Sequence, residues 1–348
     1  MADGNHPIVI AHRGASGYRP EHTLASYALA IEMGADFVEP DLVSTRDGVL
    51  VCRHENEIGG TTDVAAHPEF AARRTAKVID GVAMEGWFTE DFTLAELRTL
   101  RARERLPELR PGNTEFDGRF EVPTLDEVIA LVQRESAARG RAIGIYPETK
   151  HPSWFQSIGL ALEGPLLAAL ERVGWRDADA PVFIQSFETE NLRRLRGGTR
   201  VRLVQLMESS GRPWDFTRRG TSRTYADLAT PGGLAEVATY ADAIGPDKSM
   251  VIPRDADGRL LPPSALVADA HAAGLHVHPW TLRSENYFLP AGLRAGDPAD
   301  PAYLRLHGDA QVEAAAFFAA GVDGVFADFP DVALRARAAV DPGKHLSF

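Results

Sequence analysis

The chain has 348 residues, and 37 basic against 49 acidic side chains give a formal net charge of −12. This balance argues against a broad electrostatic grip on nucleic acid or on an anionic membrane. The single cysteine, Cys52, excludes an internal disulfide and is expected to be buried in an apolar strand. No apolar run is long enough to predict a membrane span or a signal peptide within this chain.

Short apolar runs alternate with amphipathic stretches along the whole chain. Such alternation predicts parallel strands joined by crossover helices. Strands are expected at 8–12, 37–44, 143–149, 182–187, 201–207, 243–245, 277–282 and 324–329. Helices are expected at 23–33, 125–138, 160–172, 234–240, 264–273 and 312–320. Eight parallel strands are what a closed barrel requires, so the predicted fold class is α/β, a (β/α)₈ TIM barrel.

Three segments are longer than this minimal repeat needs. Residues 56–121 are too long for a plain connection, whereas 208–231 and 283–310 are smaller excursions. All three follow the ends of strands, where barrel enzymes elaborate their sites. We predict that residues 1–348 form one catalytic barrel domain, with 56–121 as an insertion after the second-strand hairpin that caps the barrel mouth.

The second strand is followed by a strong hairpin signal. Asp47-Gly48 tolerates the positive φ of a two-residue type I′ turn, and with this loop Asp41 would face His54. Glu39 would share their face, because side chains alternate along a strand. We therefore expect two carboxylates and an imidazole to meet at the base of the hairpin.

His12 and Arg13 leave the first strand where a barrel delivers side chains to its mouth. A polar pair there is costly unless it meets partners or solvent. A rim histidine hydrogen-bonded to a loop is the alternative to a site residue. Glu21 and His22 come just before the next helix and, with Thr23, are most simply interpreted as N-terminal cap material.

A third carboxylate, Glu148, ends the third strand two residues before Lys150. Together with Glu39 and Asp41 it offers three oxygen ligands, which suit Ca²⁺ or Mg²⁺ better than a structural zinc site. The alternative is a salt-bridge cluster with Lys150 and Arg13. It is less favourable, because gathered carboxylates repel one another without a cation.

Later strands end in further candidates. Trp280 either packs in the core or holds an apolar or cationic group of a substrate. Asp328 fits a cap of the last turn and a site role equally well. Ser186 has no Gly-x-Ser-x-Gly setting, so no serine nucleophile is predicted.

Two histidines beside a cation site and two basic side chains are the parts of phosphoryl chemistry. The cation and the bases stabilise charge on the phosphate oxygens. One imidazole removes a proton from the attacking hydroxyl and the other protonates the leaving alkoxide. No Gly-rich nucleotide loop is present, which favours hydrolysis over transfer from a nucleotide.

The motifs HRGASGYRPEHT, EPDLVSTRDGVLVCRHE, GIYPETK, IQSF, HPWT and GVFADFPD occur in this order. As an ordered set they resemble the glycerophosphodiester phosphodiesterase family over about residues 8–335. The long insertion is similar to that of a bacterial branch with many periplasmic or secreted members. The resemblance implies a TIM barrel and a divalent cation, with Ca²⁺ preferred and Mg²⁺ as the alternative. The implied reaction is hydrolysis of deacylated phospholipids, such as glycerophosphocholine and glycerophosphoethanolamine, to sn-glycerol 3-phosphate and an alcohol.

The family's site residues transfer onto matching positions here. The resemblance implies His12 and His54 as the acid–base pair, Glu39, Asp41 and Glu148 as metal ligands, and Arg13 and Lys150 as phosphate contacts. Trp280 is added as a substrate-binding candidate. Glu-Pro-Asp-Leu stands where the family usually has Glu-x-Asp-Val, a change that leaves every polar group in place.

Other functions stay open at this stage. A related barrel lyase of the phospholipase C/D type would act on phosphoinositide or lysophospholipid head groups and stop at a cyclic phosphate. A silent binding barrel would capture the diester without turnover, and an exported hydrolase would act on glycerol-phosphate polymers such as teichoic acid. The expected partner is a small molecule for a soluble protein; its compartment and oligomeric state are not predicted.

Overall fold

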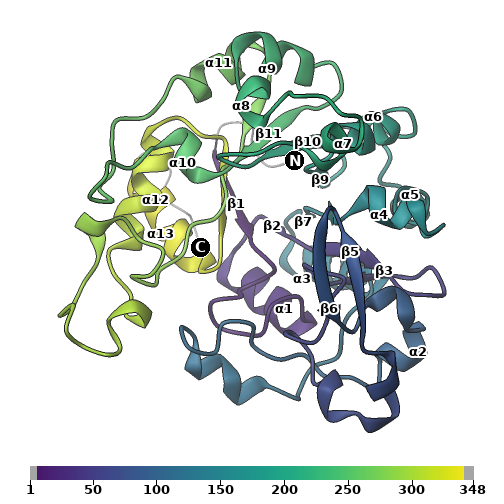
Figure 1. The fold of residues 1–348 in the computed structure, drawn as a ribbon. Coiled ribbons are helices and arrows are strands. Elements are labelled where there is room, and N and C mark those ends of the chain that lie inside the picture. Colours follow the sequence, from purple (N-terminus) through teal and green to yellow (C-terminus); the bar gives the residue numbers. More distant parts are fainter. Residues whose placement is uncertain (1–5, 341–348) are drawn as a thin grey trace.

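The computed structural model describes residues 6–340, so the ends of the predicted 1–348 domain lie outside the described residues. Figure 1 shows helices arranged around a ring of strands. Strand β1 (Ile8–Ala11) pairs in parallel with both β2 (Phe37–Val38) and β13 (Gly324–Ala327). Because the first and last strands are neighbours, the sheet closes on itself. The predicted barrel is confirmed.

Prolines divide two of the barrel strands. The second barrel strand is β2 followed by β3 (Asp41–Ser44), with Pro40 between them. The third is β7 (Gly144–Ile145) followed by β8 (Glu148–Thr149), with a second proline at 147. Proline has no N–H to donate to the ladder, so pairing is interrupted there. The two strands remain neighbours on both sides of the break, since β2 pairs with β7 and β3 with β8.

The remaining strands complete the ring in chain order. They are β9 (Phe183–Ser186), β10 (Arg202–Met207), β11 (Ala243–Pro246) and β12 (His276–Val277), all parallel. A bridge between Leu282 and Ala327 joins the extension of β12 to β13. Eight parallel barrel strands are therefore present among residues 6–340, as predicted.

Helices surround the barrel at the predicted places. The predicted ones are α1 (Leu24–Met33), α3 (Leu125–Arg139), α5 (Glu163–Arg172), α9 (Pro231–Val237), α11 (Leu266–Ala272) and α12 (Ala310–Ala319). The others are α2 (Leu94–Leu97), α4 (Pro152–Ser157), α6 (Thr189–Arg196), α7 (Trp214–Arg218), α8 (Tyr225–Leu228), α10 (Lys248–Val251) and α13 (Pro330–Val340). Local sequence sets the ends of α1: Thr23 caps its start and Gly34 ends it at a φ of 105°. Nowhere between residues 6 and 340 is a helix long and apolar enough to span a lipid bilayer.

The hairpin after the second barrel strand forms, but its predicted register is wrong by one residue. Strand β4 (Leu50–Cys52) pairs antiparallel with β3, and the Arg53 N–H donates to the Asp41 carbonyl. Asp41 therefore lies opposite Arg53, and His54 lies beyond the ladder. The loop contains three residues, of which only Gly48 has a positive φ (78°). A three-residue loop with glycine in the left-handed region replaces the expected two-residue turn.

The insertion, residues 56–121, contains little regular structure apart from one hairpin and the short helix α2. Strands β5 (Thr75–Ile79) and β6 (Val82–Gly86) form this hairpin, and within residues 6–340 they pair with no other strand. Its 3-10 helices are Val64–Ala66, Pro68–Arg73, Thr89–Asp91 and Pro111–Phe116. Figure 1 shows the insertion in blue on the side of the barrel that carries α3 and β3. Its division from the barrel as a cap stays a prediction.

Aromatic side chains fill the barrel interior. Phe183 stacks on Tyr146 with ring centroids 5.0 Å apart, and it meets Phe37 edge to face at 5.4 Å. Ile10 and Phe326 belong to the same buried cluster. This packed interior supports the strand ends that carry polar groups.

Phe183→Ala should lower the free energy of unfolding by about 3–5 kcal/mol, the usual cost of removing a buried aromatic ring. Val312→Ala, at a position 53% exposed on α12, is the control and should change it by less than about 0.5 kcal/mol. Urea denaturation of both variants measures the difference. Equal stabilities would contradict the barrel interior described above.

Candidate active site

Three carboxylates meet at the ends of the second and third barrel strands. One oxygen from each of Glu39, Asp41 and Glu148 lies within 4.8 Å of the others, and all three side chains are buried. Asp41 and Glu148 are register partners on β3 and β8, which places them side by side. Glu39 ends the first part of the same barrel strand. The structure thus brings together the three acids that the sequence selected as metal ligands.

Burial and neighbouring charges shift the pKa values of the three acids in different directions. Burial raises the pKa of Glu39 well above the usual value, with repulsion from Asp41 adding to the effect. It also raises the pKa of Glu148 to about 7, against the opposing charge of Lys150. Burial disfavours charge on Asp41 too, but attraction and a hydrogen bond from His22 hold its pKa well below the usual value. One acid is therefore ionised, while two resist ionisation without a further positive charge.

A hard divalent cation fits this cluster. The Oδ1 atom of Asp41 is buried and has no hydrogen-bond partner among the described residues. A cation there would satisfy that oxygen and favour the charged forms of Glu39 and Glu148. Oxygen-only donors are the ligands that Ca²⁺ and Mg²⁺ prefer.

His12 follows β1 and lies between two acids. Its Nδ1 is 2.5 Å from Oδ1 of Asp328, and its Nε2 is 3.8 Å from Oε2 of Glu39. Asp328 is ionised, since Arg283 and other positive neighbours hold its pKa well below the usual value despite burial. The Nδ1–H of His12 therefore donates to Asp328. Burial, followed by the charge of Arg13, lowers the pKa of His12 to about 3, so the free ring is neutral at pH 7.

His54 lies on the other side of the cluster, between Lys150 and Glu55. Its Nε2 is 3.2 Å from Nζ of Lys150. Its Nδ1 is 2.6 Å from Oε1 of Glu55, a close contact that is not aligned as a hydrogen bond. Burial, then the charges of Arg13 and Lys150, lowers the pKa of His54 well below its usual value. This ring is also neutral at pH 7, and its Nε2 is a proton acceptor.

Arg13 carries the positive charge nearest to both histidines. Its NH1 is 3.0 Å from Oε2 of Glu21, and its Nε is 3.5 Å from Oδ2 of Asp41. The interpretation of Glu21 and His22 as cap material is wrong, because only Thr23 caps the helix. The buried charges of Arg13 and Asp41 need partners, and Glu21 and His22 supply them; His22 Nε2 lies 2.9 Å from Asp41 Oδ2.

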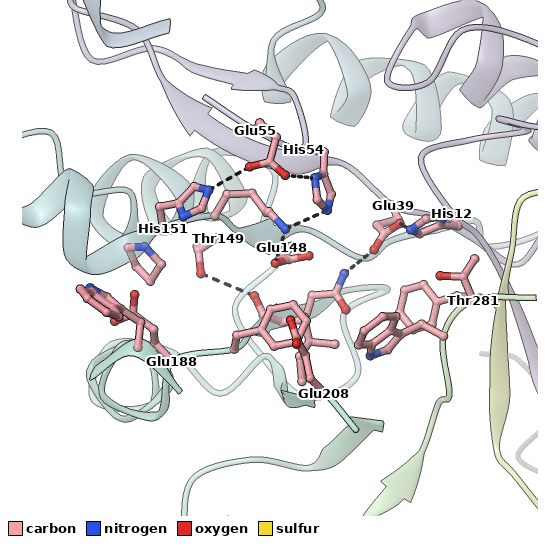
Figure 2. Close-up of a pocket in the computed structure, with 18 of the residues that line it drawn as sticks. His12, Glu39, His54, Glu55, Glu148, Thr149, His151, Glu188, Glu208 and Thr281 are labelled. Carbon is pink, nitrogen blue, oxygen red and sulfur yellow. Dashed lines mark hydrogen bonds and ion pairs between the residues drawn. The ribbon is translucent and has the colours of Figure 1, made fainter. Parts of the chain in front are cut away.

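Both histidines and two of the three clustered acids line one cavity of about 490 Å³. The third acid, Asp41, is buried outside the lining, as are Glu21, His22 and Asp328. Figure 2 shows His12, His54, Glu39 and Glu148 around it. Trp280 lies on another wall, where its indole N–H donates to a backbone carbonyl and its ring meets another aromatic side chain edge to face. The other aromatic residues that line the cavity are Phe187, Trp214, Tyr225 and Phe326. The predicted site residues that line it are His12, Arg13, Glu39, His54, Glu148, Lys150 and Trp280.

Several cavity residues were not selected from the sequence. Glu55, Asp80 and His151 all line the cavity, and His151 contacts both acids. The dipeptide Asp80-Gly81 is a hairpin signal, so the turn could have been predicted from the sequence. No local pattern indicates that Asp80 contacts His151. Asp328, which was equally consistent with a cap, contacts His12.

A model of the glycerophosphoryl diester phosphodiesterase family matches residues 12–332. The chain belongs to this family. It is 35% identical over 336 residues to glycerophosphodiester phosphodiesterase GDPD6 of Arabidopsis thaliana, covering 93% of this chain and 84% of that protein. It is 30% identical over 352 residues to a glycerophosphodiester phosphodiesterase of Haemophilus influenzae, covering 94% and 89%. The predicted family is confirmed.

Solved structures agree on the fold. A glycerophosphoryl diester phosphodiesterase of Silicibacter pomeroyi superposes with a TM-score of 0.67 at 21% identity, covering 96% of this chain and 94% of that one. A phosphodiesterase of Oleispira antarctica, solved with the product sn-glycerol-3-phosphate, gives a TM-score of 0.59 at 20% identity, with 95% and 96% covered. Glycerophosphodiester phosphodiesterases are metal-dependent, which accords with a buried acidic cluster that can bind a divalent ion.

Cation binding should stabilise the protein. Ca²⁺ or Mg²⁺ at about 100 times its dissociation constant should raise the free energy of unfolding of chelator-treated protein by about 2.7 kcal/mol. Glu148→Gln should remove most of this gain, because it deletes one charged ligand. Glu208→Gln is the matched control, since Glu208 lines the same cavity outside the cluster. Urea denaturation with and without the cation measures the gain; an undiminished gain in Glu148→Gln would exclude the cluster as the site.

Proposed function

We propose that the protein hydrolyses glycerophosphodiesters, such as glycerophosphocholine or glycerophosphoethanolamine, to sn-glycerol 3-phosphate and an alcohol. One observation carries the proposal: two neutral histidines line the same cavity as Glu39 and Glu148, which with the buried Asp41 form a cluster of acids able to hold a cation. The names of the relatives and the product bound by the Oleispira phosphodiesterase support this substrate class.

We assign His12 and His54 as the general acid–base pair. One imidazole accepts the proton of the attacking hydroxyl through a free ring nitrogen, and the other gives a proton to the leaving alkoxide oxygen. Each ring has a carboxylate near its Nδ1, Asp328 for His12 and Glu55 for His54. A carboxylate in this position orients the ring and stabilises the imidazolium when it forms.

The remaining groups bind the substrate. Glu39, Asp41 and Glu148 hold the divalent cation, for which we propose Ca²⁺ with Mg²⁺ as the alternative, and this cation supplies charge stabilisation at the phosphate oxygens. We propose Arg13 and Lys150 as the phosphate contacts, and Trp280 as a wall for the alcohol group. Arg13, Lys150 and Trp280 all line the cavity, which supports the roles that the sequence predicted for them.

We also propose that the chain forms one catalytic barrel domain, capped by residues 56–121. Three charged contacts from the insertion support this arrangement. Arg105 reaches Glu21 at 2.9 Å, and Arg110 reaches Glu285 at 2.6 Å. The third, between Asp80 and a histidine of the cavity wall, is treated below.

Removing either histidine should abolish most of the activity. His12→Ala and His54→Ala should each lower kcat by roughly 10²–10⁴-fold, the range for a general acid or base. His271→Ala is the control, because His271 is exposed and does not line the cavity. Release of sn-glycerol 3-phosphate from glycerophosphocholine and glycerophosphoethanolamine is the measurement.

The same assay tests the cation and the product. Chelation should stop turnover, and Ca²⁺ or Mg²⁺ should restore it. Near-full activity of either histidine variant would refute the assigned pair. A cyclic phosphate that accumulates in place of sn-glycerol 3-phosphate would refute hydrolysis to the monoester.

A further inference from the structure

A row of four side chains leads from the insertion to the cavity. Oδ2 of Asp80 lies 2.5 Å from Nδ1 of His151, and Nε2 of His151 lies 3.2 Å from Oε2 of Glu55. The other oxygen of Glu55 lies 2.6 Å from Nδ1 of His54. Figure 2 shows His151, Glu55 and His54 in this order. The insertion is thereby connected to one of the two proposed catalytic histidines.

The protonation of His151 follows from its partners. Both ring nitrogens face carboxylates, which can only accept hydrogen bonds when ionised, so both nitrogens carry hydrogen and the ring is cationic. Burial alone would lower the pKa of His151, as does the charge of Lys150 on its own segment. Hydrogen bonds to Asp80 on the hairpin turn and Glu55 after β4 outweigh both and raise the pKa to about 9. A raised pKa means that the cation persists below about pH 9 and is lost above it.

The cation fixes the carboxylate beside His54. Burial would raise the pKa of Glu55, but the hydrogen bond from His151 and the close contact with His54 hold it far below the usual value. The Glu55 side chain is 40% exposed, so without His151 it would be free to rotate into solvent. With His151 bound to one oxygen, the second oxygen stays at the Nδ1 side of His54.

Asp80 and His151 both have an unusual backbone conformation. Their φ values are 50° and 47°, which non-glycine residues seldom adopt. Such conformations persist where surrounding contacts hold them, commonly at functional sites. The turn is also packed tightly on its other side: a Cβ added to Gly81 would lie 2.9 Å from the ring of Trp214. The hairpin tip is therefore held between Trp214 and His151.

We propose that Asp80 and His151 are positioning residues for His54 and act through Glu55. They keep the Nδ1 side of His54 fixed, so that its Nε2 faces the phosphorus. This inference deepens the proposed function and rests on the assignment of His54 to the acid–base pair. It also gives the insertion a part in catalysis beyond covering the cavity.

Asp80→Asn and His151→Asn test the proposal, because asparagine tolerates the positive φ at both positions. Each variant should lower kcat on glycerophosphocholine by on the order of 10–100-fold, the loss seen when a group that orients a metal-ligating histidine is removed. KM should change by less than about threefold, since neither side chain is proposed to bind substrate. The double variant should be no slower than the slower single variant, because the two act as one unit.

The pH dependence separates positioning from simple structural support. His54 is surrounded by Lys150, Arg13, Glu55 and Asp41. Loss of the nearby His151 cation leaves the negative charge of Glu55 less compensated and so raises the pKa of His54. The limb of the kcat/KM profile that reports His54 should therefore move to higher pH in His151→Asn: the acidic limb if His54 is the base, and the basic limb if it is the acid.

Glu85→Gln is the matched control, because Glu85 is an exposed acid on the same hairpin that forms an ion pair with Arg74 and does not line the cavity. It should keep wild-type kcat and pH profile. The proposal is overturned if both asparagine variants keep wild-type kcat, if the loss lies in KM, or if the two losses multiply in the double variant. Activity retained by His54→Ala would instead refute the proposed acid–base pair, and this inference with it.

Discussion

Three buried carboxylates confined within 4.8 Å of one another are the constraint on which the rest of the site depends. Like charges at this distance in a poorly solvated place cannot all ionise unless positive charge lies among them. Arg13 and Lys150 supply part of it, and His22 secures Asp41 by a hydrogen bond. The barrel brings the acids together because neighbouring parallel strands end at the same rim. Their mutual repulsion then determines which other side chains the rim must carry.

The same positive charges set the state of the histidines. Burial and Arg13 lower the pKa of both His12 and His54, and Lys150 lowers that of His54 further. In the free enzyme both rings are neutral at pH 7, although acid–base catalysis needs one of them protonated. A bound phosphodiester anion would raise both pKa values through its negative charge. Substrate binding and protonation of one imidazole are therefore coupled through electrostatics at this rim.

The sequence predicted the barrel well and the details of its second strand poorly. Apolar periodicity locates a strand, because it reflects burial of a whole segment. Register depends on one residue more or less in a turn, and Gly48 fits both a two-residue and a three-residue loop. The predicted pairing of Asp41 with His54 was wrong for this reason. His54 nevertheless lines the cavity. It follows the last paired residue of β4, so the strand pairing does not determine the direction of its side chain. The helix α6 was missed because its sequence, TENLRRLR, is mostly polar.

The contacts that the sequence could not predict are those between distant charges. Asp80 and His151 are 71 positions apart, and Arg110 and Glu285 are 175 apart. Local patterns indicate that such residues are polar, but not which partner each one meets. An insertion that packed on the barrel through apolar side chains alone would not change the pKa values of the site residues. This one contacts the barrel through charged groups, of which Asp80 and its partner His151 line the cavity. In the arrangement that we propose, a change of charge at Asp80 reaches His54 through His151 and Glu55.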